Sequence, residues 1–147
     1  MEKIVKKSIK MVFKTLIQQG EHKEAYEFTT RGDLFKKGQS EYLRFEEKFG
    51  EDQTVQTTMK WNGHELMLIR QGSILMRQAF IAGETTVGRY VTSEISWETT
   101  AKTEKVVVAW PNGKKRGKIH LRYHFLMQGQ DTGTHEVRLT LEEDKSK

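Results

Sequence analysis

Apolar and polar side chains alternate one by one along much of this sequence, and that period restricts the fold more than any other feature. The clearest stretch covers residues 118–127. Its odd positions are apolar or aromatic, namely Ile119, Leu121, Tyr123, Phe125 and Met127. Its even positions are mostly basic, namely Lys118, His120, Arg122 and His124. Because successive side chains of a β-strand point to opposite faces, this pattern predicts a strand with one face on a core.

Two hairpins follow from the same pattern. Val137, Leu139 and Leu141 alternate with polar residues, and the segment 129–133, which begins and ends in glycine, predicts a turn before them. We expect the apolar residues of 119–125 and 137–141 to face one interior. Upstream, Asn62-Gly63 predicts a hairpin between 54–61 and 65–71. Both residues readily take positive φ, which a type I′ turn requires.

The whole chain divides into short segments of this kind. We predict about ten strands, near residues 3–18, 24–35, 40–49, 53–61, 65–71, 73–82, 85–92, 94–109, 116–128 and 133–143. Strands at such regular spacing, without helices between them, are typical of a barrel or a sandwich. The length of 147 residues fits one domain, 1–147.

The first segment is ambiguous. Its apolar residues fit one face of a basic amphipathic helix, which would indicate a membrane surface or a partner groove. Ile9, Met11, Phe13, Thr15 and Ile17 also alternate as a strand. The β-branched residues of this segment and the all-β remainder favour the strand.

Several short motifs carry a resemblance to a known family. They are Thr30-x-Gly32, Tyr42-Leu43-x-Phe45-Glu46-Glu47, Arg70-x-Gly72, Met76-x-Gln78-x-Phe80-x-x-Gly83, Tyr90-x-Thr92 and Gly117-x-Ile119-x-Leu121-x-Tyr123. In this order and spacing, over nearly the whole chain, they resemble the YwiB-like family of uncharacterised bacterial proteins. The resemblance implies an all-β fold, a single closed antiparallel up-and-down barrel similar to lipocalins and other calycins, with the first segment as a strand. It implies no established activity.

One departure from the family concerns the turn after Tyr90-x-Thr92. The family usually has a glycine a few residues further on, whereas here Ser93-Glu94-Ile95-Ser96 follows without one. The conformation of that turn is therefore open.

Composition excludes several classes of protein. The chain has no cysteine, which excludes a disulfide framework, thiolate catalysis and Cys-ligated metals. No apolar run reaches the roughly 20 residues of a membrane span. The first twenty residues are charged throughout, so we expect no secretory signal and a cytoplasmic location.

Catalytic and metal-binding motifs are missing from the sequence. His120 and His124 share a strand face, but four residues of strand span about 13 Å, too far for one ion. Glu46 and Glu47 point to opposite faces and cannot act as an acid/base pair. There is no phosphate loop, dinucleotide fingerprint or nucleophile elbow. We therefore expect no metal and no cofactor, and assign no enzymatic activity.

Four polar residues at inward-facing positions are the candidate ligand-binding residues. Arg70 shares a face with Leu66 and Leu68, Gln78 lies among apolar residues, and Glu47 follows Leu43 and Phe45. Polar groups inside an apolar barrel need partners. One interpretation is a structural Glu47–Arg70 ion pair. The other is that Arg70, Gln78, Tyr90 and Glu47 orient a small amphipathic or anionic ligand, because binding pockets combine apolar walls with a few polar groups.

A basic surface loop suggests an alternative function. Lys114, Lys115, Arg116 and Lys118 follow Trp110 closely, and the formal net charge of the chain is +5. Such a loop could bind RNA phosphates, with Trp110 as a stacking face, or an acidic protein partner. The simpler interpretation is a solvated hairpin loop whose lysines prevent aggregation. The oligomeric state stays open.

Overall fold

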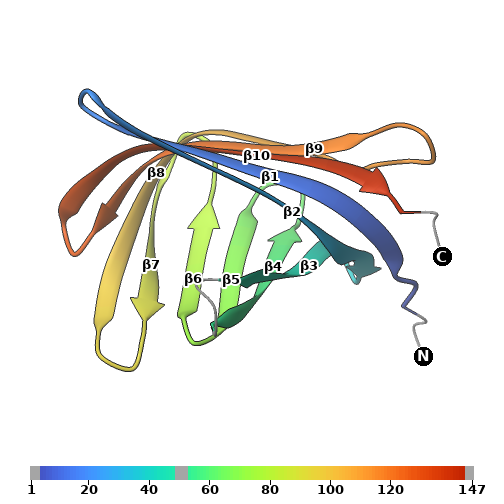
Figure 1. The fold of residues 1–147 in the computed structure, drawn as a ribbon, viewed down its shortest axis with the longest axis horizontal. Helices are drawn as coiled ribbons and strands as arrows, with labels where there is room; N and C mark the ends of the chain where they lie inside the picture. The colour runs from blue at the N-terminus through green and yellow to red at the C-terminus, as the bar shows by residue number, and fades with distance from the viewer. Residues whose placement is uncertain (1–3, 49–52, 145–147) are drawn as a thin grey trace.

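The computed structural model describes residues 4–48 and 53–144, and all regular structure in these ranges is β-strand. The ten strands, shown in Figure 1, are β1 (Lys7–Gln19), β2 (His22–Lys37), β3 (Ser40–Lys48), β4 (Thr54–Trp61), β5 (Leu66–Gly72), β6 (Leu75–Phe80), β7 (Thr85–Val91), β8 (Ser96–Ala109), β9 (Gly117–Met127) and β10 (Gln130–Glu143). The predicted number and order of strands are confirmed.

The strands form one closed antiparallel barrel. Each strand pairs with its neighbours along the chain, and β1 closes the barrel by pairing with β10. The first segment is a strand, as predicted, with both edges occupied by ladders, to β2 and to β10. It begins at Lys7 rather than near residue 3: residues 4–6 are not in a strand, and residue 3 lies outside the described range. This pairing outweighs the local helical pattern.

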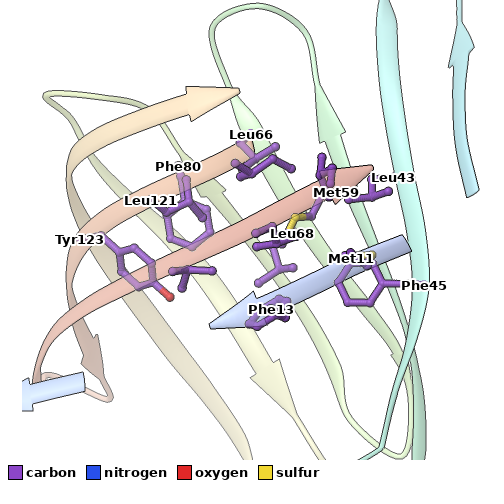
Figure 2. Packing of buried hydrophobic residues seen from close by; sticks show 14 of the residues in the cluster. Met11, Phe13, Leu43, Phe45, Met59, Leu66, Leu68, Phe80, Leu121 and Tyr123 are labelled. Atoms are coloured by element: carbon purple, nitrogen blue, oxygen red, sulfur yellow. The ribbon is translucent and has the colours of Figure 1, made fainter. Parts of the chain in front are cut away.

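The core lies inside the barrel on the predicted faces. The interior residues predicted on β9 and β10 are all buried, namely Ile119, Leu121, Tyr123, Phe125, Val137, Leu139 and Leu141. Apolar residues of the adjacent strand β1 and of β3 to β6 pack with them in the same interior, and Figure 2 shows Met11, Phe13, Leu43, Leu66 and Phe80 among these. Period-two alternation therefore identified the buried face of the C-terminal hairpin correctly.

Two predicted turns differ in detail. The β9–β10 turn is Gln128-Gly129, both at positive φ, rather than 129–133. β10 already begins at Gln130 and holds a bulge before Thr134, which absorbs the glycine-containing segment.

The Asn62-Gly63 hairpin forms, but the predicted type I′ turn is wrong. Trp61 pairs with Leu66, so the loop has four residues, and only Gly63 takes positive φ. The Asn62 carboxamide oxygen accepts hydrogen bonds from the backbone N–H groups of His64 (2.9 Å) and Glu65 (2.7 Å). The side chain of Asn62 thus stabilises the loop as an Asx turn instead.

The turn that lacks the family glycine is closed by a threonine. The backbone N–H of Thr92 donates to the Ile95 carbonyl (2.9 Å). The Thr92 hydroxyl oxygen accepts from the N–H groups of Glu94 and Ile95, both at 3.3 Å. These bonds hold the turn between β7 and β8 without glycine.

The two ends of the barrel differ. We call the end with the β1–β2, β5–β6, β7–β8 and β9–β10 turns the mouth, and the opposite end the closed end. Near the closed end the interior is filled by side chains with no exposed surface, namely Ile9, Leu43, Leu66, Ile119 and Leu141. Any space for a ligand therefore lies toward the mouth.

Candidate functional site

The half of the barrel nearest the mouth contains a cavity of about 840 Å³. Its apolar lining consists of Phe13, Phe28, Met59, Leu68, Met76, Phe80, Leu121, Phe125, Met127 and Val137. Eight-stranded barrels are just wide enough for side chains to fill, and diameter grows with strand number, so ten strands leave additional room. The volume and the largely apolar wall are typical of sites for small organic molecules.

A buried ion pair lies in the wall of this cavity. The Arg70 Nε lies 3.2 Å from Glu47 Oε1, and the Thr57 hydroxyl donates to the same oxygen at 2.5 Å. Thr57 stands directly opposite Phe45 on β3 and opposite Arg70 on β5, which brings Glu47, two residues beyond Phe45, onto the same face. The ion pair predicted from the alternation is present.

The burial of this pair determines how it contributes to stability. The side chain of Glu47 is 6% exposed and that of Arg70 is 19% exposed, so both charges have lost most of their hydration. Mutual attraction offsets much of that cost, and the pair adds little net stability compared with apolar residues. Removing one partner alone is costly, because the other charge stays buried.

Gln78 lies within the wall rather than at the cavity. Its side chain has no exposed surface and it is not among the residues that line the cavity. Its Nε2 donates to the Ala79 carbonyl (3.1 Å) and the Thr86 hydroxyl (3.1 Å), while its Oε1 accepts from the Thr99 hydroxyl (2.5 Å). Gly88 leaves room for this network, since a Cβ there would lie 2.5 Å from Gln78 Oε1. These contacts link β6, β7 and β8.

Tyr90 does line the cavity, near the mouth. Its ring stacks on Trp97 of the neighbouring strand, with 6.5 Å between the ring centroids. The structure therefore brings Arg70, Glu47 and Tyr90 together around one cavity and leaves Gln78 outside it. That these residues bind a ligand stays a prediction.

Several further polar residues line the cavity and were not predicted as site residues, among them Tyr123 and His135. Burial raises the pKa of Tyr123 to about 12, although the positive charge of Arg70 opposes this shift, so Tyr123 keeps its proton as a hydrogen-bond donor. Burial lowers the pKa of His135 to about 4, and the charge of His124 lowers it further. His135 shares the inward parity of Val137 and Leu139, which was the signal that could have identified it.

The His135 ring is held by polar contacts with Thr132. Its Nε2 lies 3.0 Å from the Thr132 hydroxyl oxygen, which in turn lies 2.7 Å from the Phe125 carbonyl oxygen. The ring stacks on Tyr123, with centroids 5.3 Å apart. His135 thus forms part of a largely apolar wall.

Acidic side chains lie beside the basic loop. Lys114, Lys115, Arg116 and Lys118 are exposed, but Arg116 lies 3.2 Å from Glu142. The Glu143 carboxylate accepts from the backbone N–H of Gly113 (2.7 Å), which places a second acidic group at the loop. Trp110 is partly buried against the core, and its indole nitrogen is buried, so only part of its ring is accessible.

The histidines on the outer wall bind carboxylates. His120 Nε2 lies 2.8 Å from Glu136, and His124 Nε2 lies 2.8 Å from Asp131. Within residues 4–48 and 53–144, no three His, Cys, Asp or Glu side chains are grouped to hold a metal ion. No helix in this part of the chain is long and apolar enough to cross a membrane.

Comparison with known proteins identifies the family. The chain is 25% identical over 131 residues to the uncharacterised β-barrel protein YwiB of Bacillus subtilis (strain 168), covering 88% of this chain and 89% of that protein. The crystal structure of the ywiB protein from Bacillus subtilis superposes with a TM-score of 0.83 at 23% identity, over 95% of this chain and 94% of the other. The model of a domain of unknown function, DUF1934, matches residues 11–139. With nearly nine-tenths of its length matched, the chain belongs to the DUF1934 family, whose function is unknown.

Proposed function

We propose that the barrel binds a small amphipathic molecule in its cavity. The observation that carries this proposal is the cavity of about 840 Å³, whose accessible wall is mainly apolar and whose polar groups include Glu47, Arg70 and Tyr123. A barrel whose own side chains filled its interior would leave no such space. Apolar walls bind by excluding water, and the few polar groups orient the bound molecule.

The polar groups define how the molecule would be held. The Arg70 guanidinium offers several N–H donors and the Tyr123 hydroxyl one more, while Glu47 accepts. An anionic ligand would compete with Glu47 for Arg70, because a guanidinium can bind both oxygens of a carboxylate. A molecule with an uncharged polar end could bind beside the intact pair.

Native mass spectrometry of protein purified from its own host tests the proposal. We expect a bound small molecule, released on denaturation. In a second assay, the uncharged fluorescent probe N-phenyl-1-naphthylamine should bind the purified protein with a blue-shifted, enhanced emission. Thr15→Trp, which fills part of the cavity, should weaken this binding at least tenfold.

Thr85→Trp is the matched control, since Thr85 is an exposed strand residue and does not line the cavity. It should leave probe binding unchanged. Equal binding by both tryptophan variants, or no probe binding and no copurifying molecule, would contradict the proposal.

A further inference from the structure

The barrel wall is interrupted between β2 and β3. β2 pairs with β1 from His22 to Leu34, but its ladder with β3 covers only Gly32 to Lys37. The last three residues of β3, 46–48, pair with β4. Within the described part of the chain, no ladder pair joins β2 to β3 on the mouth side of Gly32 and Phe45. The two strands therefore separate toward the mouth.

Gly32 marks the point of separation. A Cβ at this position would lie 2.5 Å from the Arg44 carbonyl oxygen and 3.1 Å from the Phe45 Cβ. Glycine inside a strand is typical of a bend or of a close approach by another backbone. Here it allows β2 to contact β3 closely at the pair nearest the mouth. On the mouth side of Gly32, β2 keeps its ladder with β1 and has no ladder pair with the described part of β3.

The cavity passes through this interruption. In a continuous wall, only inward-facing side chains line an interior cavity. Thr30 and Glu47 face inward, since Thr30 stands opposite the buried Met11 and Glu47 is itself buried. Yet the outward-facing Thr29, Glu46 and Lys48 line the same cavity. The cavity therefore opens sideways between β2 and β3.

The charges at this opening are balanced. The acidic and basic side chains among the described lining residues are Glu46, Glu47, Lys48 and Arg70, two of each sign. His135 adds no charge near neutral pH, because burial holds its pKa at about 4. An opening without net charge favours an uncharged polar group over an anion. An anion would lose hydration there, and no excess of positive charge would compensate for that loss.

We propose that an elongated amphipathic molecule enters and leaves through the opening between β2 and β3, and that its uncharged polar end stays at the Glu47–Arg70 pair. Its apolar part then contacts the apolar lining of the cavity, which includes Phe13, Phe28 and Leu68. This inference rests on the proposed function and adds the route and the chemical class of the ligand.

Bridging the opening tests the route. The chain has no cysteine, so Thr29→Cys with Lys48→Cys supplies the only two thiols, which bismaleimidoethane can link. The control is Thr85→Cys with Lys102→Cys, a matched Thr–Lys pair standing directly opposite each other in the continuous β7–β8 ladder. Stopped-flow fluorescence then measures association and dissociation of N-phenyl-1-naphthylamine, with bridging verified by mass.

Each bridged protein is compared with the same cysteine variant before linking, and we expect the bridge at 29/48 to slow both rates at least tenfold, while the bridge at 85/102 changes neither rate. Equal rates in the two bridged proteins would overturn the route and leave the binding function standing. Absence of probe binding in the unmodified protein would instead overturn both proposals. A bulky maleimide label on Thr29→Cys alone, compared with one on Thr85→Cys, gives the same comparison without a bridge.

A second probe tests the uncharged polar end. 8-Anilino-1-naphthalenesulfonate has the ring system of the first probe and adds a sulfonate. We expect it to displace N-phenyl-1-naphthylamine from the cavity at least tenfold less effectively. Displacement at equal or lower concentration would overturn the preference for an uncharged end.

Discussion

Replacing Arg70 with alanine separates a structural role of this residue from a ligand-binding role. The substitution leaves Glu47 with the Thr57 hydroxyl and without the guanidinium that lies 3.2 Å away. Breaking a buried pair by removing one partner costs about 3–5 kcal/mol. We expect the lower end, about 3 kcal/mol, because the Arg70 side chain keeps 19% exposure and Thr57 still donates to Glu47.

Urea unfolding followed by tryptophan fluorescence measures this cost. We expect a lower urea concentration at the unfolding midpoint, with an unchanged dependence of the unfolding free energy on urea concentration. The Tm should be lower by roughly 6–12 °C for a chain of this size. Arg77→Ala is the matched control, an exposed arginine on the neighbouring strand β6, expected to change stability by less than about 0.5 kcal/mol. Replacing Glu47 and Arg70 together with alanine should cost less than the sum of the two single changes.

One result would refute the structural role. If Arg70→Ala is as stable as Arg77→Ala, the buried pair does not support the folded apoprotein. If that variant also loses a small molecule that copurifies with the unmodified protein, Arg70 acts on the ligand instead.

Two further predictions concern the wall and the pH dependence. Gly88→Ala should destabilise the protein by about 2 kcal/mol or more, because the added Cβ would clash with the Arg77 carbonyl and with Gln78. The control Val87→Ala changes an exposed position and should cost less than about 0.5 kcal/mol in the same urea assay. His135 has a folded-state pKa of about 4, below its ordinary 6.5, so the stability that depends on its neutral form is present above pH 6.5 and is lost as pH falls toward 4. His135→Phe should flatten this part of a Tm-against-pH profile, and a profile as steep as that of the unmodified protein would contradict the assignment.

The site was predictable where it depends on local alternation. Glu47 and Arg70 each occupy an inward parity among apolar neighbours, and a buried charge needs an opposite charge nearby, so the pair could be anticipated. Gln78 has the same pattern, yet its bonds go to Thr86 and Thr99 on two other strands. Nothing local distinguishes a polar side chain that bonds within the wall from one that faces a cavity.

By itself, the sequence determined the ten strands, their order and most of their inward faces, because the period of two is a property of each strand alone. Only the tertiary structure decided the bulge between Thr103 and Lys105 in β8, after which Val106 rather than an odd-numbered residue stands opposite the buried Leu121. It also decided the cavity and the separation of β2 from β3 at Gly32. The cavity and the separation both depend on how much of the barrel interior the inward side chains of all ten strands fill together. That filled volume is not a property of any single segment.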